Sequence, residues 1–350
     1  MTGRAPLTAA DERFAHQLVA PAAVTVHEHP AWAERSYHLL MVDDHTILNI
    51  GRAVYPRGGR RTGFAGVVRG GTLHAHRARE PMAPGDDPDR PDVGPVRIEV
   101  LEPLRRVRLA LDDPGSRVAF DLVYEARFAP VPTARNRIEL KGEVVTDYMN
   151  FFQSGRFSGV LSVDGHDVAV RDRAGFRDRG WGLRKHEGAP RRGFVLFAGV
   201  ELPDAALYAL LYETASGRRM FTNGWLMDEG GVADTVVEAA HDLEWDGTLL
   251  RAGRLDLTFA SGDRRTLTLD VRTRMYLSAV GYTADPAGAE PGRDVHDVTD
   301  PAARARLDGQ IDNGCRFALD GVEGHGYAET GLGVHARYRP DDAPEGAGAA

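Results

Sequence analysis

The stretch Phe120-Asp-Leu-Val-Tyr-Glu-Ala-Arg-Phe128 shows the pattern that decides the fold class of this 350-residue chain. Apolar side chains occupy every second position, and the positions between them are mostly polar. A period of two is typical of a β-strand with one face in a core and the other in water. The same alternation recurs in residues 255–259 and, after the turn residues 261–263, in residues 267–271. We therefore expect a chain built mainly of strands.

Turn signals join these strands into antiparallel hairpins. Asp164-Gly165 lies between the apolar runs 157–163 and 168–170, and a two-residue Asp-Gly turn is a strong hairpin signal. Ser216-Gly217 marks another hairpin in the same way. Antiparallel meanders of this kind close into barrels or stack as sandwiches. The 40 glycines and 20 prolines exclude a helical bundle, because both residue types break helices.

Only short helices are expected. Thr8 and Asp11 resemble a capping box before a short N-terminal helix. Asp300 and Pro301 suit the N-cap and the first position of a helix that runs to about Leu307. Neither helix is long enough to organise the fold.

The length predicts two domains or one large β architecture, at about 100–200 residues per domain. We place a boundary near residues 148–155, which gives one β domain over residues 20–150 and a second over residues 151–338. The tail, residues 339–350, contains mainly Asp, Ala, Gly, Glu and Pro and is expected to be disordered. Several prolines within residues 81–95 predict an exposed loop there.

The charge balance and the cysteine count restrict the partners and the compartment. Lysine and arginine total 43 and aspartate and glutamate total 51, so the formal net charge is −8. Such a chain is poorly suited to nucleic acid or to an anionic membrane surface. No apolar stretch approaches the ~20 residues of a membrane-spanning helix, and no secretory signal is visible. The single cysteine, Cys315, excludes an intrachain disulfide and a cysteine-based zinc site. We expect a cytoplasmic protein, and the sequence leaves its oligomeric state open.

The densest cluster of ionisable residues lies in residues 171–184, between two predicted hairpins. Within it, Trp181 offers a flat apolar face and an indole N–H donor. Asp178 can pair with Arg177 or Arg184, or it can act as a proton donor if it is buried. Two interpretations follow: a structural plug of arginine, aspartate and tryptophan at a barrel end, or part of a binding site.

Three motifs in this half of the chain carry a family resemblance. They are Phe-Gln-Ser-Gly-Arg-Phe-Ser-Gly at residues 152–159, Val-Asp-Gly at residues 163–165 and Gly-Phe-Arg-Asp-Arg-Gly-Trp-Gly at residues 175–182. Together they resemble the signature of the lipocalin-like superfamily that includes carotenoid 1,2-hydratase, also called hydroxyneurosporene synthase. Residues 324–329 are similar to a Gly-x-Gly-x-x-Glu segment near the end of many members. The resemblance covers roughly residues 32–332.

The resemblance implies two lipocalin-like β domains packed together. It also implies a cofactor-independent enzyme that hydrates, dehydrates, isomerises or cyclises a lipophilic small molecule of terpenoid or polyketide type. In such enzymes an acid protonates an alkene, and aromatic faces stabilise the carbocation in a dry pocket. Here Arg179 and Gly180 replace the His and Ser of the family motif, and a guanidinium cannot donate a proton near neutral pH. These departures argue against carotenoid hydration itself.

Eight residues are candidates for the pocket of such a protein. Catalytic roles are assigned to Asp178, Tyr212 and Glu329, and substrate contacts to Arg177, Arg179, Trp181, Tyr208 and Tyr327. Asp178 would donate a proton or orient the arginines, and Trp181 would form a wall of the pocket. No cofactor is expected.

Two other functions stay open. The first is a carrier that binds a lipophilic ligand without catalysis. A desolvated carboxyl group that faces the cavity without an arginine partner would favour the enzyme, because such a group is held protonated. The second is a metal-dependent cupin-like enzyme that uses the His-x-His pairs His27/His29 and His74/His76. Their ligand set is incomplete, so we expect no bound metal.

Overall fold

The computed structural model describes residues 7–16, 18–19, 24–25, 29–83, 85–140, 142–185, 192–282 and 290–340. Nearly all regular structure in these residues is β-strand, which confirms the predicted fold class. The predicted capping box is present at the 3₁₀ helix η1 (Ala9–Glu12), where the Thr8 amide donates to the Asp11 carboxylate at 2.7 Å. The helix predicted after Asp300 is α1 (Pro301–Arg306), with the Ala302 amide donating to the Asp300 side chain at 2.9 Å. No helix in the described part of the chain is long and apolar enough to cross a membrane.

The chain folds into two compact units. Unit 1 contains residues 1–187 and 279–304, and unit 2 contains residues 188–278 and 305–350. The boundary expected near residues 148–155 falls inside strand β13 (Glu143–Val163), which belongs wholly to unit 1. Residues 341–350 of the expected disordered tail lie outside the described residues, as does His27.

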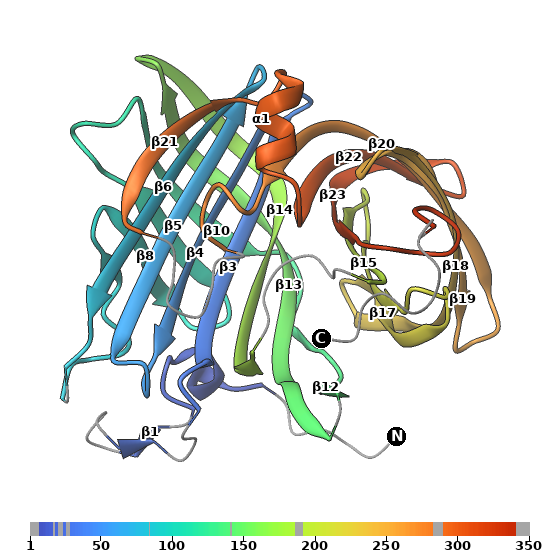
Figure 1. The fold of residues 1–350 in the computed structure, drawn as a ribbon, viewed down its shortest axis with the longest axis horizontal. Coiled ribbons are helices and arrows are strands. Elements are labelled where there is room, and N and C mark those ends of the chain that lie inside the picture. Colours follow the sequence, from blue (N-terminus) through green and yellow to red (C-terminus); the bar gives the residue numbers. More distant parts are fainter. Residues whose placement is uncertain are drawn as a thin grey trace. The chain divides into compact units, whose positions relative to one another are not determined.

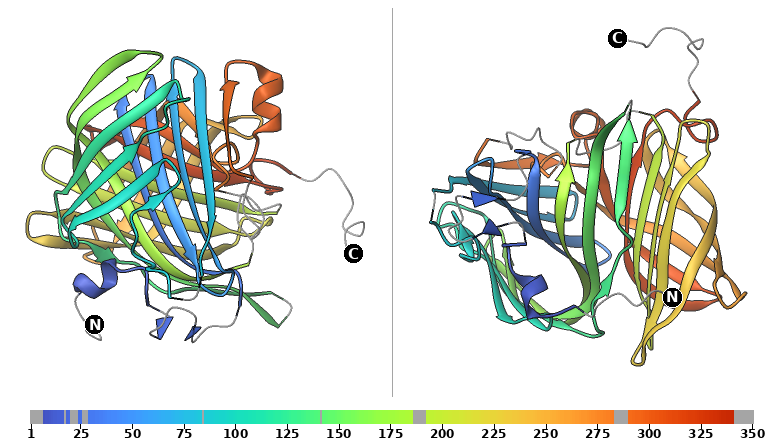
Figure 2. Two further views of the ribbon diagram at one scale, coloured as in Figure 1. Left: turned by 90° about the vertical axis from the view of Figure 1, so that its left-hand side faces the viewer. Right: turned by 90° about the horizontal axis from the view of Figure 1, so that it is seen from below.

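Unit 1 is an antiparallel sheet that curls without closing (Figures 1 and 2). Its strands run in the order β21-β6-β5-β4-β3-β14-β13-β10-β9-β8-β7, and β11 and β12 pair with β13. Their bounds are β3 Trp32–Asp43, β4 Thr46–Tyr55, β5 Arg60–Arg69, β6 Thr72–Pro81, β7 Asp92–Val93, β8 Val96–Glu102, β9 Arg106–Leu111, β10 Val118–Ala126, β11 Val131–Pro132, β12 Asn136–Leu140, β14 His166–Arg184 and β21 Gly292–Asp297. A separate short pair joins β1 (Leu18–Val19) and β2 (Val24–Thr25).

Alternation along these strands gives the unit 1 sheet an inner and an outer face. The inner face carries the core, which includes Leu40, Leu48, Leu122 and Leu161. We call the opposite face, which includes Tyr37 and Asp178, the outer face.

Unit 2 is a closed barrel of the strands β15-β16-β17-β18-β19-β20-β22-β23 (Figure 2). Their bounds are β15 Phe194–Glu201, β16 Ala206–Glu213, β17 Arg219–Asp228, β18 Gly231–Asp246, β19 Leu249–Phe259, β20 Arg264–Tyr276, β22 Ile311–Leu319 and β23 Val322–Leu332. The interior positions are apolar, and Leu196, Leu211, Leu255 and Phe317 are members of one buried cluster. Small barrels of eight strands are commonly filled by side chains in this way.

Candidate functional site

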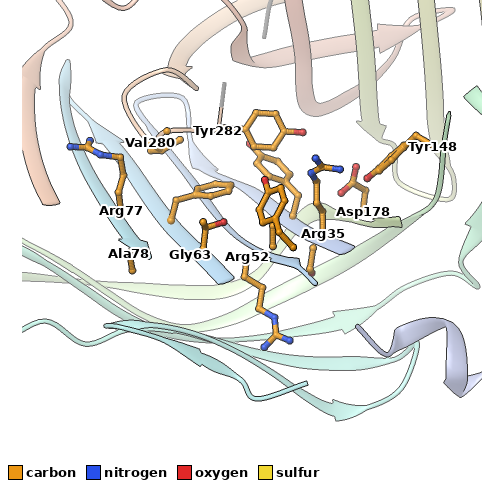
Figure 3. Close-up of a pocket in the computed structure, with 16 residues that line it drawn as sticks. Arg35, Arg52, Gly63, Arg77, Ala78, Tyr148, Asp178, Val280 and Tyr282 are labelled. Carbon is orange, nitrogen blue, oxygen red and sulfur yellow. The ribbon is translucent and has the colours of Figure 1, made fainter. Parts of the chain in front are cut away.

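A pocket opens on the outer face of the unit 1 sheet, and every residue that lines it belongs to unit 1 (Figure 3). The empty space between its lining atoms, counted out into open solvent, is about 660 Å³. The lining residues are Arg35, Ser36, Tyr37, Arg52, Ala53, Tyr55, Thr62, Gly63, Phe64, Arg77, Ala78, Tyr148, Asp178, Val280, Gly281 and Tyr282. Of the eight residues predicted for a site, only Asp178 lines this pocket.

Strand register brings the polar residues of the pocket together. Asp178 pairs with Tyr37, and Gly180 pairs with Arg35 on β3 and with Asn150 on β13. Paired residues of neighbouring strands project to the same face, so these side chains share the outer face. Figure 3 shows Asp178 and Arg35 beside Tyr148 above the sheet, while Arg52 points to the other side.

Gly180 leaves the space that Tyr148 needs. A Cβ atom at Gly180 would lie 1.9 Å from the Tyr148 hydroxyl oxygen and 2.4 Å from its ring carbon Cζ. Because glycine has no Cβ atom, this position admits the tyrosine ring at the pocket floor.

Asp178 has the properties of a group that transfers protons near neutral pH. Its carboxylate accepts a hydrogen bond from Asn150 Nδ2 at 3.4 Å. Desolvation raises the pKa of Asp178 to about 6, although Arg184, the Asn150 hydrogen bond, Arg179 and Arg35 each lower it. Among the described residues, Asp178 is hydrogen-bonded by Asn150 rather than ion-paired with an arginine.

A hydrogen bond from Thr133 fixes the orientation of the Asn150 side-chain amide. The Thr133 hydroxyl donates to the Asn150 side-chain oxygen Oδ1, and it also lies 3.0 Å from the Asn150 backbone carbonyl oxygen. Because Oδ1 is held by Thr133, the amide nitrogen faces Asp178. A donor in this position favours the ionised carboxylate.

Two guanidinium groups lie close to the Tyr148 ring. The Cζ atom of Arg184 is 5.0 Å from the centre of its ring, and that of Arg35 is 5.8 Å away. Burial and then the charge of Asp178 raise the pKa of Tyr148 to about 12. The phenol therefore stays protonated at neutral pH and is available as a hydrogen-bond donor.

An aromatic wall forms the other side of the pocket. The Tyr282 ring lies edge-on to Tyr37 at 5.4 Å and to Phe64 at 5.8 Å between ring centres. Arg77 holds the segment that carries Tyr282, because it donates to the Ala279 carbonyl oxygen at 2.6 Å. This wall offers apolar ring faces and edges to a ligand.

Three other residues of the predicted cluster, Arg177, Arg179 and Trp181, lie on the inner face of β14. Arg177 donates to the Glu12 carboxylate at 2.8 and 2.9 Å, and Arg179 is fully buried and ion-paired with Glu34. Trp181 stacks on His16 with ring centres 3.9 Å apart. The expected pairing of Asp178 with Arg177 is therefore not observed, because adjacent residues of a strand point to opposite faces. The contacts of Arg177, Arg179 and Trp181 on the inner face fit the interpretation as a structural plug.

The four remaining predicted residues lie in unit 2 and point away from the barrel interior. Tyr208 and Tyr327 contact Phe197 at 4.8 and 5.4 Å between ring centres, and Tyr212 contacts Phe221 at 6.0 Å. Glu329 accepts a hydrogen bond from Gln310. Their neighbours in sequence alternate into the apolar interior, so the barrel does not hold these side chains in a pocket of its own.

Unit 2 contains a buried ionic cluster that the sequence analysis missed. Glu213 accepts hydrogen bonds from Nε2 of His241 and Nε2 of His335, both at 3.0 Å, and from Arg219 at 2.8 Å. Desolvation alone would raise the pKa of Glu213, but His241 and Arg219 outweigh it and lower that pKa to about 2. The Tyr338 hydroxyl lies 2.7 Å from Nδ1 of His241. Glu213 on β16 thus links β18, through His241, to the segment after β23, through His335.

The other histidines do not form a ligand set in the described residues. Nδ1 of His29 accepts the Ala31 amide at 3.1 Å, and Nε2 of His76 lies 3.0 Å from the Ser116 hydroxyl oxygen. Burial lowers the pKa of both His74 and His76, so these side chains are uncharged at neutral pH. Across the described part of the chain, no group of three or more His, Cys, Asp or Glu side chains is arranged to hold a metal ion. The absence of a bound metal stays a prediction.

The sequence matches one family. Residues 7–289 fit the model of DUF8625, a family of unknown function. The chain belongs to this family. No curated protein matches its sequence.

Solved structures show the same fold at low sequence identity. Kievitone hydratase from Nectria haematococca is 12% identical with a TM-score of 0.55, and the match covers 91% of this chain and 95% of that protein. A protein from Nitrosomonas europaea, provisionally named AttH, is 13% identical with a TM-score of 0.52 and coverage of 86% and 91%. These two likenesses show that the DUF8625 chain shares this fold. A specific relation to carotenoid 1,2-hydratase stays a prediction.

Proposed function

We propose that the protein is a cofactor-independent enzyme that adds water to a double bond of a lipophilic aromatic molecule, or removes it. The observation that carries the proposal is the Asp178 carboxyl group, which lies in an aromatic pocket and has a pKa of about 6. Perturbed carboxyl groups in pockets are common at catalytic sites, because general acids and bases work best near the operating pH.

The surroundings of Asp178 suit reversible proton transfer. At neutral pH the carboxylate can take a proton from water, and the resulting acid can return it to carbon. Tyr148 supplies a neutral hydroxyl beside it, and Asn150 holds the carboxylate in place. The same proton transfer would serve dehydration in the reverse direction, and isomerisation is the simplest related reaction.

The fold supports the choice of reaction class. The kievitone hydratase named above shares the architecture over nearly the whole of both chains. Its name states a hydration reaction, and we extend that reaction class, not its substrate, to this chain. A carrier remains the second candidate, but a desolvated carboxyl group bonded by an amide favours the enzyme.

The test is hydration in ¹⁸O-labelled water, with mass spectrometry of the products formed from kievitone and from a panel of lipophilic aromatic alkenes. We expect the wild type to incorporate labelled oxygen and Asp178→Asn to lose about 10²–10⁴-fold in rate. Asp167→Asn on the exposed part of β14 is the matched control and should keep the full rate. Ligand binding by both proteins with no turnover by either would support the carrier instead.

A further inference from the structure

We propose that the pocket acts on a double bond conjugated to a carbonyl group, as in an aryl enone, and that Arg35 stabilises the oxyanion formed there. This inference rests on the proposed function and specifies which kind of alkene it uses. The evidence for the inference is the position of the guanidinium groups near Asp178 and over aromatic rings of the pocket.

Arginine side chains surround the reacting end of the pocket. Arg35 lines the pocket, with its Cζ atom 5.7 Å from the Tyr55 ring centre and 5.8 Å from that of Tyr148. The Arg184 guanidinium also lies over the Tyr148 ring, with its Cζ atom 5.0 Å from the ring centre. Figure 3 shows the Arg35 guanidinium beside the Asp178 carboxyl group. Negative charge that develops on a ligand at this point would be stabilised by fixed positive charge.

The same arrangement disfavours a carbocation. Aromatic faces can stabilise a cation, but those of Tyr55 and Tyr148 already have guanidinium groups over them. Arg60 adds a further cation 4.0 Å from the Tyr55 ring centre. A carbocation here would lie close to like charges and would compete with them for the rings. Protonation of an isolated alkene is therefore the less suitable reaction.

Conjugate addition of water uses each group in the pocket. Asp178 takes a proton from water while the water oxygen forms a bond to the β-carbon of the enone. The electrons of the carbon–carbon π bond move toward the carbonyl, and the negative charge comes to rest on its oxygen beside Arg35. Asp178 then gives its proton to the α-carbon, and the carbonyl re-forms. One molecule of water has been added, and no oxidant or reductant is needed.

The aromatic wall suits the remaining part of such a substrate. Tyr37, Phe64 and Tyr282 form a three-ring cluster whose centres lie 5.4 to 5.9 Å apart. An aryl group can pack against this cluster while its conjugated carbonyl points to the arginine end.

A phenol can test the charge preference without turnover. Asp178→Asn imitates the protonated carboxyl group that faces the oxyanion, and 4-nitrophenol reports its own ionisation by absorbance. We expect this variant to bind the phenolate about tenfold more tightly than the phenol, which lowers the pKa of the bound phenol by about one unit. Adding Arg35→Gln to this variant should remove the preference for the phenolate. Adding instead Arg79→Gln, a change on β6 that removes the hydrogen bond from Arg79 to Glu290, should leave the preference unchanged. Preference for the neutral phenol, or no effect of Arg35→Gln, would overturn the proposal.

Turnover then separates this inference from the proposed function. The wild type is given an aryl enone or a prenylated phenol with an isolated alkene, both in labelled water. We expect only the enone to gain oxygen, and Arg35→Gln to slow it by about 10²-fold or more. Hydration of the isolated alkene alone would overturn the inference and leave the proposed function standing. Hydration of neither compound would count against both.

Discussion

The two faces of strand β14 differ in how their charges are treated. On the inner face, Arg177 and Arg179 are fully buried, and Glu12 and Glu34 neutralise them through direct ion pairs. On the outer face, Asp178 is desolvated and receives one amide hydrogen bond in the described structure. Residues that are adjacent in sequence therefore have different effects on stability. The inner face is optimised for stability, and the outer face retains an unfavourable charge. Active sites commonly keep such a cost.

The largest expected effect concerns the inner face. Glu12→Gln leaves the buried Arg177 guanidinium without its counter-charge, and we expect it to lower the free energy of unfolding by about 3–5 kcal/mol. Urea denaturation followed by fluorescence measures this. Glu102→Gln, which breaks the exposed pair with Arg105, is the control and should cost less than about 1 kcal/mol. Equal effects of the two substitutions would remove the distinction between the faces.

The next effect tests the close approach on the outer face. Gly180→Ala places a methyl group where the Tyr148 hydroxyl lies, and we expect a loss of about 3 kcal/mol from overpacking. Truncating the ring in Gly180→Ala/Tyr148→Ala should cost less than the sum of the two single substitutions. Additive effects in thermal and urea denaturation would show that the two residues are not in contact.

Asp178→Asn should raise stability while it removes activity. The folded-state pKa of about 6 lies above the ordinary 3.8, so the folded state disfavours the ionised form. Folding therefore loses stability as the pH rises from about 4 to about 6, and the loss persists above that range. We expect the variant to gain about 2 kcal/mol at pH 7.5 and almost nothing at pH 3.5, after allowance for partial exposure of the carboxyl group. Destabilisation at pH 7.5 would mean that Asp178 has an ionic partner after all.

The smallest expected effect is a change in the pKa of Asp178 when its hydrogen bond from Asn150 is removed. Asn150→Leu removes the donor that favours the carboxylate, so the pKa of Asp178 should rise by about half a unit or more. Carboxyl ¹³C NMR, assigned with the Asp178→Asn spectrum, follows this directly. Thr133→Val, which releases the Asn150 side-chain oxygen, should shift the pKa in the same direction by less. A pKa that falls in either variant would contradict the assigned orientation of the amide.

Local patterns in the sequence predicted much of the fold. Period-two alternation at residues 120–128 and 255–259 predicted strands β10 and β19, of which β10 ends at Ala126, and capping residues predicted both short helices. These features depend on neighbours in sequence, which is why they could be predicted. The division of the chain could not, because unit 1 is discontinuous and the expected boundary fell within one long strand.

The candidate site was predicted only in part. The sequence motif identified Asp178, but it grouped that residue with Arg177 and Trp181 as if the segment had one face. The alternation rule that predicted the strands would have separated them. Arg35 and Tyr148 could not be found in this way, since they reach Asp178 through strand register between distant segments. The one local signal was Gly180, because its missing side chain leaves the space for Tyr148.

The discontinuity of unit 1 bears on the order in which the pocket is completed during synthesis. Tyr282 and its neighbours form part of the pocket wall, yet they follow the whole of residues 188–278 in the chain. A ribosome must therefore produce strands β15 to β20 of the barrel before it delivers the last wall of the pocket. A nascent chain halted before residue 279 would carry Asp178 and Arg35 on their strands without the aromatic lid contributed by Tyr282. Ligand-dependent protection should thus appear late in translation, after strands β15 to β20 have emerged.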